Sequence, residues 1–165
     1  MEKRDLYDIN RNLTGETIFK DENIPPNRRI LVVLSFIQNS KGELLVQKRT
    51  PQKDGKFAFT GGHPKSGETS IQGMITEISE EIGLNLSEDE LKLIYTDMDD
   101  EVFFDLYYIK KDFDISSLTM QEEEVSYVQW NTIDEIISME KQGIFKKEHF
   151  EAFERFLKII DKGEI

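Results

Sequence analysis

Three glutamates stand close together in a segment that has the pattern of a helix: Glu77, Glu80 and Glu81. At about 100° per residue their carboxylates fall on one flank of an apolar stripe, which is formed by Ile71, Met74, Ile75, Ile78 and Ile82. Carboxylates three or four residues apart repel by about 0.2–0.5 kcal/mol per pair, and a mid-helix glycine such as Gly73 costs about 1 kcal/mol relative to alanine. A hard divalent cation would reverse the repulsion. Taken alone, the glutamates favour a solvated acidic face over a metal site, so the residues around them must decide.

The charge balance excludes several classes of protein. The 165 residues carry a net charge of −12, which argues against a protein that coats nucleic acid. Apolar runs such as 30–34 are too short to cross a bilayer. The absence of cysteine excludes disulfides, thiolate nucleophiles and cysteine-based zinc sites. We expect a cytoplasmic protein without membrane or nucleic-acid partners. Bases collect between residues 41 and 65 and acids between 66 and 101, which suits an anionic ligand bridged by metal or reflects chance segregation of solvated charge.

The elements that must position these residues follow from periodicity and punctuation. A helix is predicted over 69–82, with Thr69 or Ser70 as its N-cap and Gly83 at its end. Residues 2–17 indicate a leader with one short strand and a turn at Gly15. Further strands are predicted over 30–37, 43–48, 57–59, 91–96, 102–109 and 124–130, and further helices over 132–139 and 146–160. Strands interleaved with three helices predict an α/β layered sandwich. One domain is expected over 1–165, with 1–28 as its N-terminal leader.

The loop and helix over 62–84 resemble the Nudix box, Gly-x5-Glu-x7-Arg-Glu-U-x-Glu-Glu-x-Gly-U, where U is apolar. The matching residues are Gly62, Glu68, Glu77, Ile78, Glu80, Glu81, Gly83 and Leu84. One defined position differs, because Thr76 stands where the family has arginine. The hairpin that ends at Arg49 and the strand over 124–130 also resemble the family. Residues 5–15 and Thr60–His63 are similar to the subgroup of isopentenyl-diphosphate isomerases.

The resemblance implies a Nudix fold, an α/β/α sandwich with a mixed sheet, and hydrolysis of a diphosphate linkage in a nucleoside diphosphate linked to X. It implies that Glu77, Glu80 and Glu81 bind Mg²⁺ or Mn²⁺ together with the carbonyl of Gly62, and that Glu68 supports them. Water activated by the metal would attack phosphorus. The general base stays open among Glu80 and the run 122–124. The family arginine holds the carboxylates in place, and Thr76 cannot replace its bidentate fork, whereas Lys65 offers another base.

Several residues have two interpretations. Arg49 is placed as a phosphate-binding base or as surface charge, and His63 as a substrate contact or an idle loop residue. Phe57 and Phe59 suit stacking on a planar group, although core packing is more typical of such residues. The apolar residues of 150–160 indicate core covering, with a homodimer surface as the alternative.

Two rival functions remain. An isopentenyl-diphosphate isomerase is disfavoured because the related enzymes rely on a cysteine. A non-catalytic Nudix-like binding or regulatory module is favoured slightly by Thr76 and opposed by the three glutamates. The box does not identify the substrate, so nucleoside triphosphates, nucleotide sugars, dinucleotides and non-nucleotide diphosphates all stay open.

Overall fold

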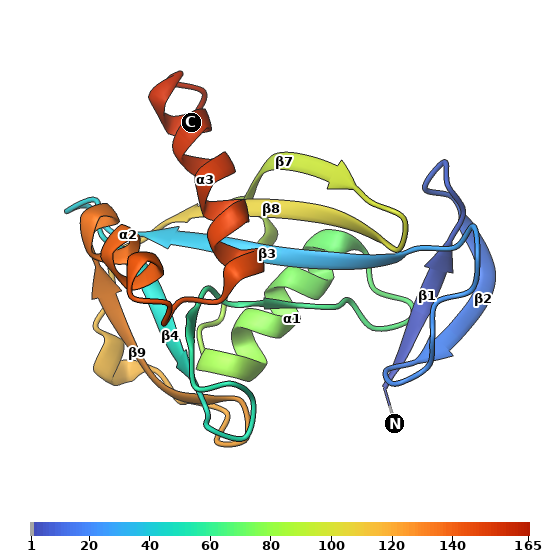
Figure 1. Ribbon diagram of the computed structural model, residues 1–165, viewed down its shortest axis with the longest axis horizontal. Helices are drawn as coiled ribbons and strands as arrows, with labels where there is room; N and C mark the ends of the chain where they lie inside the picture. The colour runs from blue at the N-terminus through green and yellow to red at the C-terminus, as the bar shows by residue number, and fades with distance from the viewer. Residues whose placement is uncertain (1) are drawn as a thin grey trace.

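The computed structural model describes residues 2–165 (Figure 1). Nine strands, three helices and two short 3₁₀ turns make up these residues. The strands are β1 (Lys3–Tyr7), β2 (Leu13–Phe19), β3 (Ile30–Gln38), β4 (Leu44–Arg49), β5 (Phe57–Ala58), β6 (Gly61–Gly62), β7 (Lys92–Met98), β8 (Val102–Lys110) and β9 (Val125–Asn131). The helices are α1 (Ser70–Ile82), α2 (Ile133–Lys141) and α3 (Lys147–Asp161), and the turns lie at Glu88–Glu90 and Ile115–Ser117. The predicted helices and main strands are confirmed to within a few residues at their ends.

A mixed sheet of seven strands organises the fold. Strand β3 pairs in parallel with β8, from Ile30 opposite Val102 to Gln38 opposite Lys110, and antiparallel with β6. Strand β4 pairs antiparallel with β5 and β9, and β7 extends the β8 edge. The β-branched and apolar sequence of β3 is buried along almost its whole length, as expected for a strand covered on both faces.

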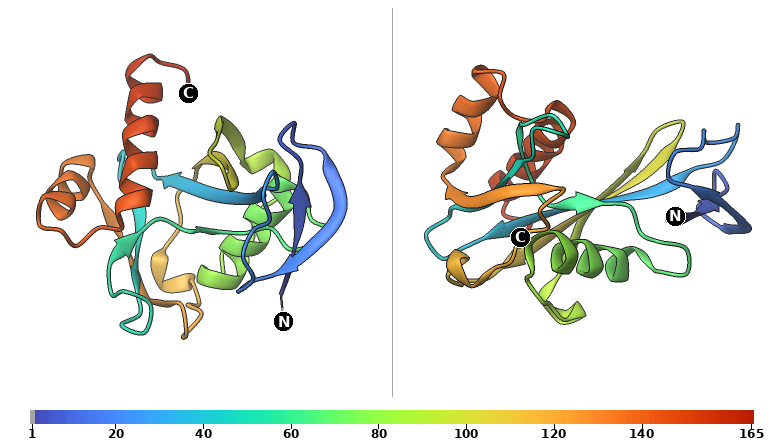
Figure 2. Two further views of the ribbon diagram at one scale, coloured as in Figure 1. Left: turned by 45° about the vertical axis from the view of Figure 1, so that its right-hand side comes forward. Right: turned by 90° about the horizontal axis from the view of Figure 1, so that it is seen from below.

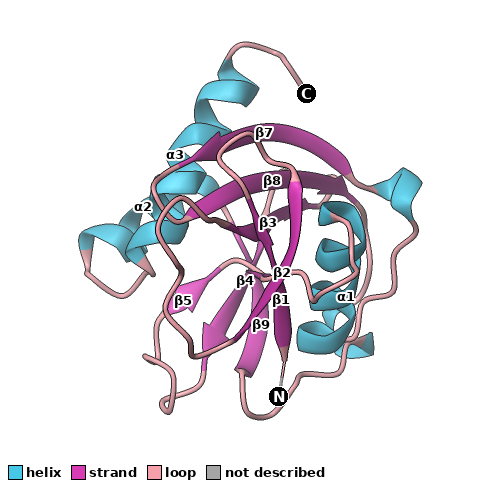
Figure 3. Cartoon of the chain, turned by 90° about the vertical axis from the view of Figure 1, so that its right-hand side faces the viewer, coloured by secondary structure: helices cyan, strands magenta, loops and turns pink. Residues whose placement is uncertain are grey.

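Helices cover both faces of the sheet, as Figures 2 and 3 show: α1 lies on one side, and α2 and α3 lie on the other. On the α1 side, Met74, Ile78 and Ile82 are fully buried against the sheet, in agreement with the predicted apolar stripe. On the other side, aromatic rings dominate, and Phe36 stacks on Phe156 with centroids 4.7 Å apart. This arrangement confirms the predicted α/β/α sandwich. No helix within residues 2–165 has both the length and the apolar character to cross a membrane.

The N-terminal segment differs from the prediction. It forms an antiparallel hairpin of two strands, β1 and β2, and the turn lies between Tyr7 and Leu13. Gly15 lies inside β2 with φ of 80°, so this glycine marks an irregular strand rather than the turn. Asp8 stabilises the turn, because its carboxylate accepts hydrogen bonds from the backbone N–H groups of Asn10 and Asn12 at 2.9 Å.

The hairpin is fixed to the rest of the fold at both ends. The guanidinium of Arg11 forms a bidentate pair with Asp105 of β8, a residue only 1% exposed. Asp5 accepts hydrogen bonds from the hydroxyl of Ser66 at 2.6 Å and from the backbone N–H of Gly67 at 2.9 Å. These contacts place β1 beside the loop that leads into α1.

Candidate metal and diphosphate site

Helix α1, which carries the three glutamates, is capped at both ends. Thr69 and Gln72 form a capping box at the start, and Gly83 ends the helix in the left-handed conformation with φ of 72°. A Cβ on Gly73 would lie 2.5 Å from the side chain of Pro64. Gly73 therefore leaves room for the loop that precedes the helix, which accounts for a glycine in the middle of α1.

Strand β6 brings a second glycine directly against the helix. A Cβ added to Gly62 would lie 2.5 Å from the carboxyl carbon of Glu77. Any other residue here would displace that carboxylate. The structure thus brings the backbone of Gly62 and the side chain of Glu77 together, as the sequence predicted.

The carboxylates of Glu77 and Glu81 are held in an unfavourable environment. Burial first, and then the charge of Glu80, raises the pKa of Glu77 to about 7. Burial, followed by the charges of Glu77 and Glu124, raises the pKa of Glu81 to about 9. Glu81 is 8% exposed, and its Oε2 accepts no hydrogen bond from any described residue. A buried acid with an unpaired oxygen, beside a second, half-buried acid, is costly unless a cation compensates it, so this donor set fits a divalent metal.

The set of side chains alone does not complete a coordination sphere. Within residues 2–165, no three Asp, Glu or His side chains converge closely enough to hold a cation. A metal at Glu77 and Glu81 would therefore need further oxygens from the Gly62 carbonyl, from water or from substrate. Mg²⁺ usually keeps such non-protein ligands.

Thr76 takes part in the network that surrounds the glutamates. Its hydroxyl donates a 2.6 Å hydrogen bond to Glu68, whose other oxygen accepts from the backbone N–H of Lys65 at 2.7 Å. The ammonium of Lys65 pairs with Glu80 at 2.7 Å. Threonine and lysine together thus contact both acids, and the absence of the family arginine leaves neither Glu68 nor Glu80 without a partner.

A cleft of about 240 Å³ surrounds these residues and mixes charges of both signs. Its walls include Gly62, Glu77, Glu80 and Glu81 on one side and the cations Arg49 and Lys53 on another, together with Glu2, Arg4, Lys20, Gly61, His63, Gln121 and Glu124. Arg49 pairs with Asp54 at 2.8 Å, and Lys53 pairs with Glu124 at 3.0 Å. Of the predicted general-base candidates, Glu80 and Glu124 line the cleft, and Glu122 and Glu123 do not.

Both histidines lie at the site and are neutral at pH 7. Burial, with smaller contributions from the charges of Arg4 and Lys20, lowers the pKa of His63 to about 4. Burial lowers the pKa of His149 in α3 to about 3. The Nδ1 of His149 accepts a 3.2 Å hydrogen bond from the backbone N–H of Phe59. Because Nδ1 is the acceptor, the proton of the neutral ring must be on Nε2.

A groove leads from the cleft beneath α3. Its first part, about 350 Å³, shares Arg49, His63 and Glu81 with the cleft and also contains His149. Apolar side chains provide most of its remaining wall, and they are Val32, Val33, Leu34, Phe59, Phe104, Leu106 and Ala152. Phe59 is fully buried among core rings, which confirms that it is a core residue, although it also lines the groove.

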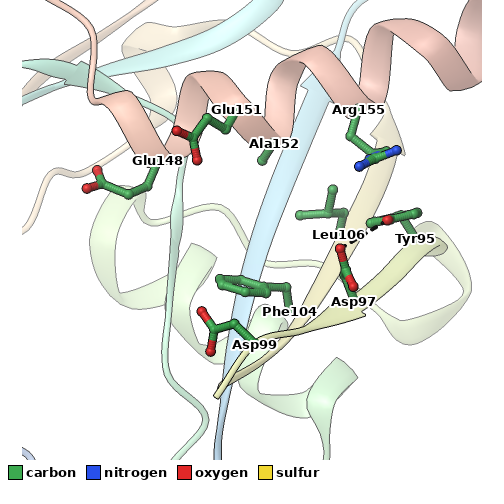
Figure 4. Close-up of a pocket in the computed structure, with 9 residues that line it drawn as sticks. All are labelled: Tyr95, Asp97, Asp99, Phe104, Leu106, Glu148, Glu151, Ala152 and Arg155. Atoms are coloured by element: carbon green, nitrogen blue, oxygen red, sulfur yellow. Dashed lines mark hydrogen bonds between the residues drawn. The ribbon is translucent and has the colours of Figure 1, made fainter. Parts of the chain in front are cut away.

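The groove continues into a second hollow of about 360 Å³ between α3 and strands β7 and β8 (Figure 4). Phe104, Leu106 and Ala152 belong to both parts. At the far end, the Arg155 guanidinium lies 4.7 Å from the centre of the Tyr95 ring. Asp97, near the end of β7, and Asp99, in the turn that follows it, also line this hollow, alongside Glu148 and Glu151.

Arg4, Lys20 and His149 are site residues that the sequence did not single out. The first two lie more than forty residues before the box, and His149 lies more than sixty after it. The alternation of β1, in which Arg4 and Leu6 are buried and their neighbours are more exposed, is the only local sign that Arg4 faces inward.

The chain is similar to known Nudix proteins in sequence and in fold. A model of the NUDIX domain matches residues 28–156. An uncharacterized Nudix hydrolase of Listeria monocytogenes is 35% identical over 149 residues, which are 88% of each chain. Among solved structures, the protein DR0079 of Deinococcus radiodurans has a TM-score of 0.77 at 22% identity, covering 93% of this chain and 98% of that one. The NUDIX domain of Shewanella oneidensis NrtR, solved with ADP ribose, has a TM-score of 0.62 at 14% identity, covering 80% and 88%.

Proposed function

We propose that this chain, which belongs to the NUDIX domain family and is a pyrophosphohydrolase, cleaves a diphosphate linkage in a nucleoside diphosphate joined to X or in a similar small phosphorylated metabolite. One observation carries the proposal: the buried Oε2 of Glu81 has no hydrogen-bond partner within residues 2–165 and lies beside Glu77 in a cleft that also contains cations. Such a site suits a metal ion and the phosphate oxygens that the metal accompanies.

The metal is proposed to be Mg²⁺ or Mn²⁺, held by Glu77, Glu81 and the carbonyl of Gly62, with Glu80 as a further ligand. When bound, it would neutralise the diphosphate and lower the pKa of an attacking water. The network of Thr76, Glu68 and Lys65 keeps the flanking carboxylates oriented. Arg49 stays a proposed phosphate contact on the opposite wall of the cleft.

The group X is proposed to occupy the groove beneath α3. Apolar side chains such as Phe104 and Leu106 would contact its body, and the Nε2–H of His149 would donate to one of its acceptor atoms. The hollow beside Tyr95 gives space for a longer group. The ADP ribose bound to the NrtR domain is a diphosphate derivative of this general size, which supports a nucleotide-derived substrate.

Glu80 and Glu124 remain as the two proposed general bases. Each is engaged in an ion pair, Glu80 with Lys65 and Glu124 with Lys53. The carboxylate that acts as the base must first leave its ion pair, because the ammonium occupies the oxygen that would accept the proton. Only these two of the four sequence candidates line the cleft, so the variants Glu80→Gln and Glu124→Gln test them separately. The variant that loses the acidic limb of the pH–rate profile identifies the general base.

The subgroup of isopentenyl-diphosphate isomerases stays a prediction from the N-terminal residues. A binding module without catalysis is the other alternative, and its support from Thr76 is weakened because Thr76 and Lys65 contact Glu68 and Glu80. If the missing arginine nevertheless matters, Thr76→Arg would raise metal affinity or turnover.

Incubation with a panel of nucleoside diphosphate derivatives and Mg²⁺ tests the proposal. We expect at least one compound to yield a phosphate-containing product, and Glu81→Gln to lower this activity by more than a hundredfold at unchanged folding. Tight binding of a panel member without any product, in both Mg²⁺ and Mn²⁺, would show a binding module instead.

A further inference from the structure

The β1–β2 hairpin brings two cations to the cleft from outside the region that the NUDIX model matches. Arg4 lies in β1 opposite Ile18 of β2, and the backbone N–H of Lys20 donates to the carbonyl of Glu2 at 3.2 Å. Pairing of the two strands therefore places Arg4 and Lys20 at the same edge of the hairpin. Both side chains line the cleft that holds Glu77, Glu80 and Glu81.

The buried side chain of Arg4 has few partners among the residues that the structure describes. The residue is 9% exposed, and its Nε donates no hydrogen bond to any described atom. Within residues 2–165 the only acid at ion-pair distance is Glu2, at 3.9 Å, which is too long for a hydrogen bond. A guanidinium has five N–H donors, and a buried donor left unsatisfied is costly. The side chain thus has unused donors at the wall of the cleft in which we propose that the diphosphate binds.

The other cations of the cleft are already engaged. Arg49 pairs with Asp54 at 2.8 Å, and Lys53 pairs with Glu124 at 3.0 Å. These two residues lie on and after β4, across the cleft from the hairpin. An incoming anion would compete with those carboxylates for Arg49 and Lys53, whereas no carboxylate within residues 2–165 lies at hydrogen-bond distance from Arg4.

Hydrogen bonds hold the strand that carries Arg4 in place. The backbone carbonyl of Lys3 accepts from the N–H of Ser66 at 2.9 Å, and Asp5 accepts from Ser66 and Gly67. Bonds on both sides of Arg4 therefore fix it to the loop that precedes α1. A rigid cation of this kind can bind a phosphate without first paying for its own ordering.

We propose that Arg4 and Lys20 form a phosphate-binding subsite on the hairpin side of the cleft, which holds a diphosphate or longer polyphosphate against the carboxylates of α1. The planar fork of Arg4 binds two oxygens of one phosphoryl group, and Lys20 adds a mobile charge at the rim. The inference rests on the proposed function, because it assigns part of the same substrate.

The test measures binding of methylenediphosphonate, a diphosphate analogue whose carbon bridge water cannot cleave, by titration calorimetry in Mg²⁺. We expect Arg4→Gln to weaken binding at least tenfold and Lys20→Gln about threefold, since a hydrogen bond to a charged group contributes more than a neutral one. Arg28→Gln is the matched control, because Arg28 pairs with Glu16 and does not line the cleft. It should change the affinity less than twofold.

Thermal melts of each variant establish that the fold is intact. If Arg4→Gln does not fold, Arg4→Lys and the exposed Lys20→Gln carry the test, with the same direction of effect. If the folded Arg4 and Lys20 variants bind methylenediphosphonate as tightly as the wild type, the proposed subsite is refuted. It is also refuted if the wild-type protein does not bind this analogue. Loss of binding in these variants supports the subsite even if no compound of the hydrolysis panel is cleaved, in which case the proposed hydrolysis fails and the subsite stands.

Discussion

Replacement of Glu81 by glutamine should stabilise the metal-free protein at neutral pH while it removes the proposed activity. The pKa of this carboxyl is raised from 4.5 to about 9, first by burial and then by the charges of Glu77 and Glu124. Below pH 4.5 it is protonated in the folded and unfolded chains alike, so no penalty exists. Above pH 4.5 the unfolded chain ionises first, and stability is lost progressively until the folded carboxyl ionises near pH 9.

The size of the effect follows from the interval between the unfolded pKa and the working pH. From 4.5 to 7, at about 1.4 kcal/mol per pH unit, the penalty reaches about 3 kcal/mol. Glutamine keeps the shape of Glu81 without an ionisable proton, so the variant should be more stable than the wild type by about 2–3 kcal/mol at pH 7. At pH 4.5 the two proteins should have nearly equal free energies of unfolding.

Urea denaturation in EDTA at pH 4.5, 6, 7 and 8 measures this difference directly. Glu80→Gln is the control on the next residue of α1, since Glu80 is exposed and paired with Lys65, and it should change stability by about 1 kcal/mol or less at every pH. Added Mn²⁺ should then raise the stability of the wild type, by about 2.7 kcal/mol at a hundred times its dissociation constant, and leave Glu81→Gln unchanged. A variant that is no more stable than the wild type at pH 8 would refute the reasoning.

Three further predictions concern other parts of the molecule. Gly62→Ala should lower turnover by more than a hundredfold, because its Cβ would overlap the carboxylate of Glu77; steady-state rates with a melting control measure this, and a near-normal rate would show that β6 can move. Arg11→Ala should destabilise the fold by about 3 kcal/mol, because it leaves the buried carboxylate of Asp105 without its ion pair. Urea denaturation measures this loss and should also show that the stability of the variant falls more steeply than that of the wild type as the pH rises above 4. An effect below about 1 kcal/mol would mean that the hydroxyl groups that donate to Asp105 suffice. His149→Ala should lower kcat/KM about tenfold through the lost Nε2–H donor and leave methylenediphosphonate binding unchanged, whereas equal losses in both would indicate a structural role instead.

The sequence predicted the parts of this fold that depend on local pattern. The apolar stripe of α1, its start at Thr69 and its end at Gly83 appear as expected, because helix periodicity and caps are properties of neighbouring residues. The β-branched run of β3 identified a buried strand in the same way. The hairpin was less accessible, since Gly15 suggested a turn that the chain makes at residues 8–12 instead.

The resemblance to the Nudix box identified the acids of the site but not their state. Glu77, Glu80 and Glu81 were named from spacing, yet only the fold distinguishes them: Glu81 is 8% exposed, whereas Glu80 reaches solvent and pairs with Lys65. Likewise, the sequence indicated that Thr76 cannot replace the family arginine as a partner of the carboxylates. Its short hydroxyl reaches Glu68 because the loop before α1 folds back onto the helix.

The sequence by itself indicated the class of chemistry through its resemblance to the Nudix box, because the residues of that box are close neighbours in the chain and their spacing does not depend on distant elements. Tertiary structure alone decided which cations face that cluster. Arg4 and Lys20 reach it from the hairpin and His149 reaches the adjoining groove from α3, and each lies dozens of residues from the box. No periodicity within one segment encodes these contacts, because they arise when elements that are distant in the sequence pack against one another.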